Sequence, residues 1–354
     1  MAERLARRRR ARRTFVLIGA SLAATAIVSI CIGAVGIGPL QVAAILAKQV
    51  GVTLPWSFET QQESVLIAIR LPRVLLGILV GGALAAAGAA MQGLYRSPLA
   101  DPGLIGIGGG AAFGAVIAIV VGVAVNSVAF ASLGVYGVPV TASLGALVAG
   151  VVIHRVASAS GRAVVATMLL AGIALNAMLG AATGVLTFAS GSAAARDITF
   201  WSLGSLGGAT WRSLIAVAIP ILLCMTIMPR LSRGLDALAL GESEAGHLGV
   251  DVARLRRAVL LLVAVAVGAS VAVAGVIGFV GLVVPNLVRR WVGAGHRGVL
   301  IASTLLGSTL LLLADLVART AFTPAELPIG VVTAAVGGPC FLWLLLRDRG
   351  ALTR

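Results

Sequence analysis

The chain has 354 residues, of which 59% are hydrophobic and 11% are charged. Soluble domains carry about 25% charged residues, and the mean hydropathy here is +1.07. This composition excludes a soluble enzyme and predicts an all-α polytopic membrane protein. The net charge of +15 is also found in nucleic-acid-binding proteins. However, seven of the 27 basic residues fall in the first 13 positions, before an apolar run that starts at Phe15. Such a run sets topology or contacts lipid headgroups, so no nucleic-acid partner is expected.

The N-terminal run resembles the start of a signal peptide, but its apolar stretch is too long and lacks a small-residue cleavage site. Residues 1–14 are therefore predicted to be a basic cytoplasmic tail, 15–346 a single transmembrane domain, and 347–354 a second cytoplasmic tail. Spans need about 20 apolar residues each, so about ten fit. The apolar runs place them at 15–37, 74–94, 104–125, 133–153, 164–188, 211–229, 258–274, 276–292, 299–318 and 328–346.

The boundary between the seventh and eighth spans is irregular. Residues 275–285 (GVIGFVGLVVP) are apolar and glycine-rich without forming a clean span. Non-helical backbone at membrane depth is tolerated where protein buries it or where it lines a cavity, so a broken helix is predicted there.

Basic residues in the loops predict the orientation. Ten spans put 21 of the 27 Lys and Arg residues on the side of the N-terminus and six on the other. Cytoplasmic loops are enriched in basic residues, so both termini are expected in the cytoplasm.

One cytoplasmic loop is long enough to hold structure of its own. Residues 230–257 (RLSRGLDALALGESEAGHLGVDVARLRR) carry apolar positions among acidic ones. The pattern predicts two short amphipathic helices broken at Gly241 and Gly249, with one side open to a partner. A solvated linker is the alternative.

The sequence offers no energy source for transport. It lacks a Gly-rich nucleotide loop with lysine, a zinc-protease helix and a nucleophile elbow. Its three histidines (His154, His247, His296) and three cysteines (Cys31, Cys224, Cys340) are too scattered for a metal site or a disulfide framework. Asp315 is the clearest intramembrane acid, and Arg319 is placed to pair with it at i, i+4. These observations predict a transport subunit that is not itself an enzyme. An ion-coupled carrier is less favoured, because it would need more acidic residues within the membrane.

Seven segments in order then carry a resemblance. They are IRLPR (69–73), QGLYRSPLADPGLIGIGGGAAFGA (92–115), LLAGIALNA (169–177), FWSLGSLGGATW (200–211), LALGESEAGHLGV (238–250), GVIGFVGLVVPNLVRR (275–290) and ADLVARTAFTPAELPIGVVTAAVGGPCFLWLLL (314–346). Together they resemble the iron-chelate and vitamin B12 permease family of bacterial ATP-binding-cassette importers. This resemblance implies the type II importer fold, a homodimer in the inner membrane, two ATP-binding subunits below it and a periplasmic binding protein above. The chain itself would bind no cofactor, because ATP and Mg belong to the partner ATPase.

The resemblance also assigns roles to residues. Arg70, Arg73 and Arg319 would clasp acidic residues of the binding protein, and the first two are expected to point the same way; snorkelling to the interface is the alternative. Ser97, Pro98 and Leu99 match the cytoplasmic gate, although Ser97 replaces the usual Asn and Asn286 the usual His. The loop over 230–257 would be the coupling segment, with these residues in the ATPase cleft: Leu240, Gly241, Glu242, Ala245, Leu248 and Gly249.

Two sequence segments indicate the cargo. ADPGLIG (100–106) and RDITFWSLGSLGGATW (196–211) are most similar to haem permeases, so a periplasmic haem-binding protein is the expected donor. Arg196 is the residue expected to meet a haem propionate, with pairing to Asp197 or to lipid as the alternative. A ferric siderophore or cobalamin stays open as the cargo of the same machine.

Overall fold

The computed structural model describes residues 2–125, 134–157, 165–322 and 325–347. Within these ranges the protein is helical and contains no strand. The first half of the chain forms α1 (Ala2–Cys31), α2 (Pro39–Gln49), α3 (Thr60–Val65), the π-helical turn η1 (Leu66–Arg70), α4 (Leu71–Leu94), α5 (Ile107–Val125), η2 (Gly134–Tyr136), α7 (Gly137–Ala157) and α8 (Val165–Ala189). The second half forms α9 (Ser192–Ser202), α10 (Trp211–Ile227), η3 (Met228–Leu231), α11 (Ser232–Leu238), α12 (Glu242–His247), α13 (Val252–Ala274), α14 (Val280–Val292), α15 (His296–Thr320) and α16 (Ile329–Arg347).

Seven helices of the described residues are long and apolar enough to cross a membrane, and α5 and α16 are shorter apolar helices. With α14 they follow the ten predicted spans in order. The first helix runs without a break from Ala2 through the predicted boundary at residue 14 and ends at Cys31. Helices α2, α3 and α9 were not predicted as separate elements.

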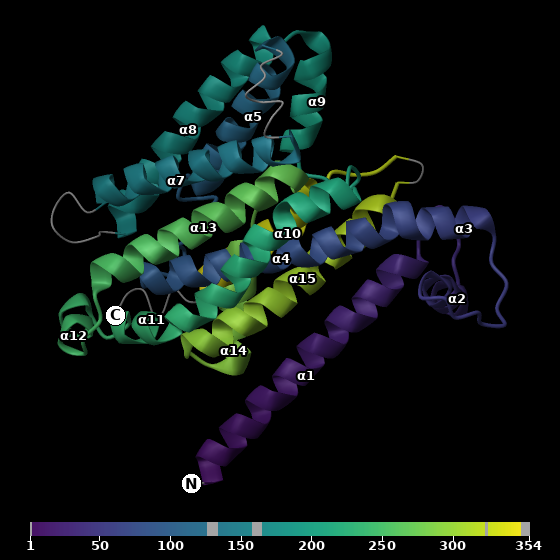
Figure 1. Ribbon diagram of the computed structural model, residues 1–354. Helices are drawn as coiled ribbons and strands as arrows, with labels where there is room; N and C mark the ends of the chain where they lie inside the picture. Colours follow the sequence, from purple (N-terminus) through teal and green to yellow (C-terminus); the bar gives the residue numbers. More distant parts are fainter. Residues whose placement is uncertain (1, 126–133, 158–164, 323–324, 348–354) are drawn as a thin grey trace.

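The long helices pack around α4, most of which is buried. Helix α15 lies along it, and α13, α14 and α10 complete the surrounding layer. The tight approach of α4 and α15 depends on glycine, because a Cβ on Gly81 would overlap the backbone carbonyl of Gly307. Small residues allow such close packing between membrane helices. Helices α5, α7, α8 and α9 form a second group at the top of Figure 1.

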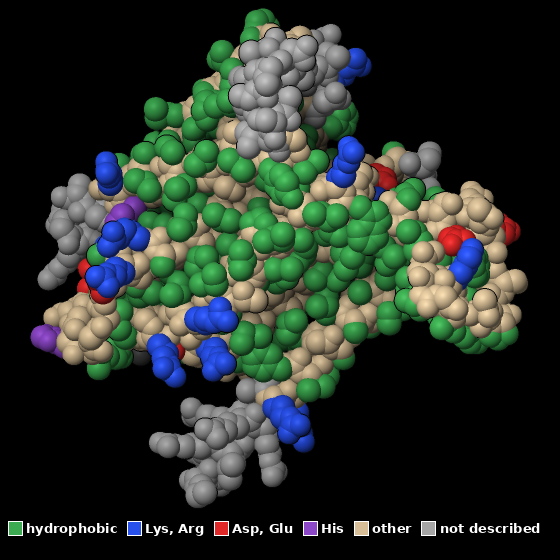
Figure 2. Space-filling model, in the orientation of Figure 1, with side chains coloured by type: hydrophobic (Ala, Val, Ile, Leu, Met, Phe, Trp, Pro, Cys, Tyr) green, Lys and Arg blue, Asp and Glu red, His purple; other side chains and the backbone are tan. Residues whose placement is uncertain are grey.

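The molecule has two polar ends and an apolar middle. Helices α11 and α12 lie at one end, whereas α2 and α3 lie at the other (Figure 1). Figure 2 shows a broad hydrophobic band between them, with most Lys and Arg side chains of this face gathered at the end of α12. This distribution is that of a membrane protein with one basic face.

The predicted break before the eighth span is present. Helix α13 ends at Ala274, and Gly275 and Phe279 both have positive φ angles, of 68° and 67°. Helix α14 then begins at Val280 and has only 13 residues. This length is too short to cross a bilayer, for which about 20 residues are needed.

Candidate functional site: the outer charge cluster, the gate turn and the coupling segment

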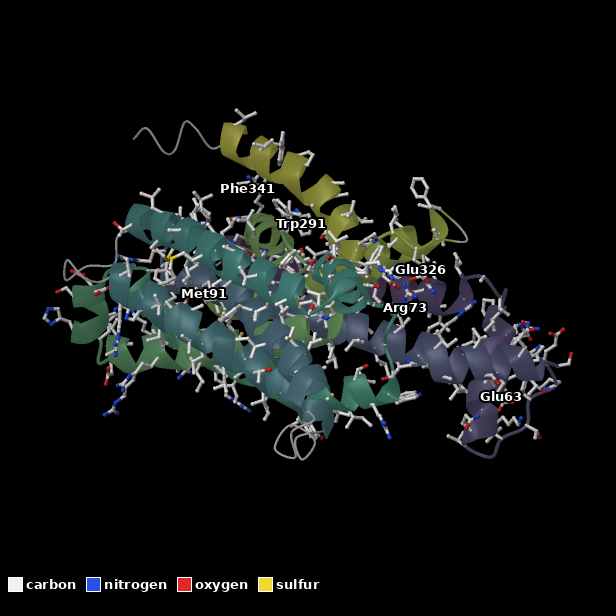
Figure 3. All side chains as sticks on the ribbon, turned by 90° about the horizontal axis from the view of Figure 1, so that it is seen from above. Glu63, Arg73, Met91, Trp291, Glu326 and Phe341 are labelled. Carbon is white, nitrogen blue, oxygen red and sulfur yellow. The ribbon has the colours of Figure 1, made fainter. Side chains whose placement is uncertain are left out.

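A cluster of buried charges lies where α4 and α15 meet at the end of the molecule near α3. The Arg73 guanidinium pairs with two carboxylates from distant parts of the chain. Its Nε lies 3.0 Å from Oδ1 of Asp315. Its Nη1 and Nη2 donate to the two Glu326 oxygens at 3.0 and 2.9 Å. Figure 3 shows Arg73 and Glu326 side by side at this end.

The exposure of the three side chains differs in a way that separates their roles. Asp315 is 1% exposed and Arg73 8%, whereas Glu326 is 45% exposed. The hydrogen bond from Arg73 lowers the pKa of Glu326, because it stabilises the ionised carboxylate. Glu326 is therefore an anion that covers the outer side of a buried arginine.

The predicted pair of Asp315 and Arg319 is confirmed, with 3.7 Å between Oδ2 and Nε. Its geometry is looser than that of the Arg73 pair. Arg319 instead donates through Nη2 to the carbonyl and hydroxyl oxygens of Ser29, at 2.5 and 2.8 Å. It thereby joins α15 to the end of α1.

Arg70 has a different environment from Arg73. Its guanidinium donates to the carbonyls of Ile30 and Cys31 at 2.6 and 2.8 Å, and also to that of Val35. The last carbonyls of a helix lack partners within the helix, so Arg70 caps α1. Arg70 and Arg73 therefore contact different neighbouring segments, Arg70 the end of α1 and Arg73 the carboxylates of Asp315 and Glu326.

The π-helical turn before α4 has a partner of its own. In η1 the backbone N–H of Leu71 bonds to the carbonyl of Leu66. The carbonyl of Ile67 is left to accept from the indole Nε1 of Trp211, at 2.9 Å. A π bulge frees a carbonyl in this way. The start of α10 is thus tied to the same outer end.

The predicted gate residues form the turn after α4. Ser97 is buried, and its hydroxyl accepts from the N–H of Leu99 at 3.3 Å. The carbonyl of Pro98 accepts from the side-chain amide of Asn286 at 3.1 Å. Asn286 lies on α14, which follows the broken segment. The gate turn is therefore held by an amide, but from α14 rather than from position 97.

An acidic residue follows this turn and is fully packed. Oδ1 of Asp101 accepts from the backbone N–H of Gly103 and Leu104, at 2.8 and 3.3 Å. Burial raises the pKa of Asp101, against the lowering effect of these two bonds. Because a Cβ on Gly281 would lie 2.7 Å from Oδ2, Asp101 fixes the spacing between the gate turn and α14.

The predicted coupling segment contains the two short helices expected, α11 and α12. They are separated at Gly241, and Gly249 follows the second; their φ angles are +136° and +81°, where residues with a Cβ are disfavoured. Ala245 is buried, whereas Leu240 and Leu248 are 68% and 63% exposed. Two exposed leucines thus flank α12 at the polar end of the molecule.

Glu242 ties α12 to the start of α13. Its Oε1 accepts from Nη2 of Arg256 at 2.7 Å. Tyr95, at the end of α4, lies near this arginine, whose charge opposes the burial that raises the pKa of Tyr95 to about 12. The segment is also tied to α15, because His296 contacts Asp236 through Nδ1 at 2.7 Å.

Arg196 lies exposed on α9, a helix that packs against α8. The part of the chain that the structure describes contains no group of three or more His, Cys, Asp or Glu residues that could hold a metal ion. The predicted docking arginines Arg70, Arg73 and Arg319 lie at one end of the molecule, whereas the gate turn and the coupling segment share the other end, where both line one cavity.

The described chain thus combines long apolar helices, one broken helix in the span region and short helices at one polar end. Residues 21–347 match the FecCD transport family. The chain belongs to this family. The hemin transport system permease protein HmuU of Yersinia pestis is 49% identical over 282 residues, which cover 79% of this chain and 83% of that protein. The cobalamin import system permease protein BtuC of Halobacterium salinarum is 42% identical over 281 residues, covering 79% and 73%.

A solved structure agrees with the fold. It is described as an inward-facing conformation of a metal-chelate type ABC transporter, and it is 32% identical with a TM-score of 0.79. The match covers 95% of this chain and 99% of that one. The predicted all-α, type II importer permease fold is therefore confirmed, and the chain is a multi-pass membrane permease of a transport system.

Several residues of these sites escaped the sequence analysis. Glu326, Arg256 and the pair of His296 with Asp236 were not singled out, because their partners lie 14 to 253 residues away along the chain. Among the ion pairs of the charge cluster around Arg73, the Asp315–Arg319 pair has the i, i+4 spacing that the sequence shows directly.

Proposed function

We propose that this protein is the permease subunit of a haem importer. Two copies would form a path along their interface, open to each side of the bacterial inner membrane in turn. Two separate ATP-binding subunits, which hold ATP and Mg, would drive the change, and a periplasmic haem-binding protein would deliver the cargo. The observation that carries this proposal is the 49% identity to a hemin permease over 79% of the chain.

The coupling segment supports the role of an ATP-driven subunit. Leu240 and Leu248 present apolar side chains next to Glu242 at the polar end. Such an exposed, mixed surface fits the cleft of a partner protein. We assign Leu240, Gly241, Glu242, Ala245, Leu248 and Gly249 to contact with the ATPase.

At the opposite end, the outer cluster would receive the binding protein. Glu326 is the exposed member, and the guanidiniums of Arg70, Arg73 and Arg319 lie beneath the surface. An incoming carboxylate can compete with Glu326 for the bidentate face of Arg73. Arg196, exposed on α9, remains our proposal for contact with a haem propionate.

The test is ATP-driven uptake in proteoliposomes that hold the permease with its ATPase and binding protein. Haem, a ferric siderophore and cobalamin are offered in turn. Accumulation of haem only with ATP and binding protein supports the proposal. Accumulation of a siderophore or cobalamin instead keeps the machine and changes the cargo. The variant Arg196→Ala should slow haem uptake, whereas Arg212→Ala, an exposed arginine at the start of α10, should not.

A further inference from the structure

A cavity of about 300 Å³ lies between the gate turn and the start of α15. The end of α4, the gate turn and α14 line it on one side, and α15 and the loop after α11 on the other. Its charged and polar lining residues are Gln92, Arg96, Ser97, Arg289 and His296. By contrast, the cavity between α14, α15 and α16 is lined almost wholly by apolar side chains.

Two guanidiniums of this cavity have no anion paired closely with them. Within the described ranges, neither Arg96 nor Arg289 makes a side-chain hydrogen bond or an ion pair within 4.0 Å. The charge of Asp236 reaches Arg289, but Oδ1 of Asp236 is already held by the ring and backbone N–H of His296, at 2.7 and 2.9 Å. The cavity therefore carries an excess of positive charge.

A buried acceptor of the cavity is also unsatisfied. The Gln92 side chain is almost fully buried, and its Nε2 donates to the carbonyl of Leu282 at 3.2 Å. Its Oε1 is buried and has no hydrogen-bond partner in the described part of the chain. A buried acceptor left without a donor is unfavourable. This acceptor is enclosed by protein, whereas an oxyanion between the two guanidiniums would satisfy both arginines.

The backbone at Arg96 adopts a conformation that is unfavourable for a residue with a side chain. Helix α4 ends with Ser97 N–H bonding to Gln92 O and Arg96 N–H to Gly93 O. In this cap the residue at position 96 adopts the left-handed conformation, with φ of 50°, which usually selects glycine. An arginine here is a conformational compromise, and functional sites are where such compromises are found.

We propose that this cavity binds an oxyanion, a carboxylate or phosphate group, between Arg96 and Arg289. The volume corresponds to about ten water molecules at about 30 Å³ each, so it holds one such group rather than a whole porphyrin. The group has two sources. It is an acidic arm of the cargo as it passes the gate, which rests on the proposed function, or a free phosphate from the cytoplasm.

The first experiment measures binding without transport. The full-length permease is placed in nanodiscs of zwitterionic lipid, and binding of radiolabelled inorganic phosphate and of succinate is measured by equilibrium dialysis. The double variant Arg96→Gln/Arg289→Gln should lose at least tenfold in affinity. The variant with lysine at both positions should keep part of the binding, and Arg155→Gln, an exposed arginine on α7, should keep all of it.

Two results overturn the proposal: wild type that binds neither anion, or a glutamine double variant that binds them as tightly as wild type. Size-exclusion profiles identify a variant that fails to fold. If the glutamine double variant fails to fold, anion binding by the two single variants and by the double lysine variant decides instead. Because this measurement needs no cargo, it stands even if the wild-type complex does not take up haem.

The second experiment separates the two sources. Proteoliposomes with the complete complex are offered haem and its dimethyl ester, which has no carboxylate. If the double variant slows haem uptake but not uptake of the ester, the ligand is the acidic arm of the cargo. If both are equally affected and phosphate in the lumen changes the wild-type rate, the ligand is cytoplasmic phosphate.

Discussion

Replacement of Arg73 by glutamine tests whether the outer charge cluster holds the fold together. In the wild type, Arg73 contacts Asp315 at 2.9 Å through Nη2, and both side chains are less than 10% exposed. Without the guanidinium, Asp315 keeps only the looser contact with Arg319, at 3.7 Å. An almost fully buried carboxylate would then be poorly compensated.

The magnitude follows from burial. Removal of one partner of a buried pair costs about 3–5 kcal/mol, since the other charge stays buried. Loss of the Glu326 contact adds little, because Glu326 is 45% exposed and exposed pairs contribute about 0–1 kcal/mol. Arg73→Gln should therefore destabilise the protein by about 3–5 kcal/mol, and Glu326→Gln by about 1 kcal/mol or less.

A double-mutant cycle isolates the pair. Unfolding of the purified permease in mixed micelles of rising SDS content is followed by tryptophan fluorescence for wild type, Arg73→Gln, Asp315→Asn and the double variant. The double variant has no unpaired carboxylate at position 315, so the two effects should fall short of additivity by about 2 kcal/mol. Arg212→Gln, at an exposed arginine, is the control. Additivity within about 0.5 kcal/mol would refute the reasoning.

Three further predictions concern the gate, the packing and the coupling segment. Arg256→Gln removes the 2.7 Å contact with Glu242; it should lower the cargo moved per ATP hydrolysed while costing about 1 kcal/mol or less in stability, and an unchanged ratio would contradict a coupling role. Gly88→Leu should prevent folding into a monodisperse permease, because even a Cβ there would overlap the Gly281 backbone, and size-exclusion chromatography checks this. Burial raises the pKa of Asp101, so ionisation is easier in the unfolded state: stability should fall as the pH rises above the unfolded value of about 3.9. Asp101→Asn should flatten this slope in thermal unfolding measured over a pH series, and an unchanged slope would exclude Asp101 as its source.

Much of the fold was readable from local patterns. The order of the apolar runs matches the order of the long helices, because each run has the length a span requires. The break before Val280 and the ends of α12 were also predicted, because glycines mark them in the sequence. In the structure Gly241, Gly249 and Gly275 all have positive φ angles. Helix α9 was missed because its 11 residues include charged ones and cannot form a span.

The site was less predictable, because its contacts are long-range. The sequence suggested Asp315 with Arg319, at the i, i+4 spacing, whereas the closer partner of Asp315 is Arg73. These residues are 242 positions apart, and only the packing of α4 against α15 brings them together. The capping of α1 by Arg70 likewise depends on where that helix ends, which the apolar run placed at residue 37 rather than Cys31.

The same pair of helices connects the two ends of the molecule. Helix α4 carries Arg73 at its outer end, and the gate turn follows its inner end. Helix α15 carries Asp315 at its outer end and begins at His296, which contacts Asp236 of the coupling segment. Between them, the Gly81–Gly307 approach leaves no room for a Cβ, so the two helices pack closely, backbone against backbone. A displacement of α11 by a protein bound at the α12 end should therefore move α4 and α15 as one rigid body. Movement at the gate turn and at the outer cluster would then be coupled by geometry, without a chain of flexible contacts between them.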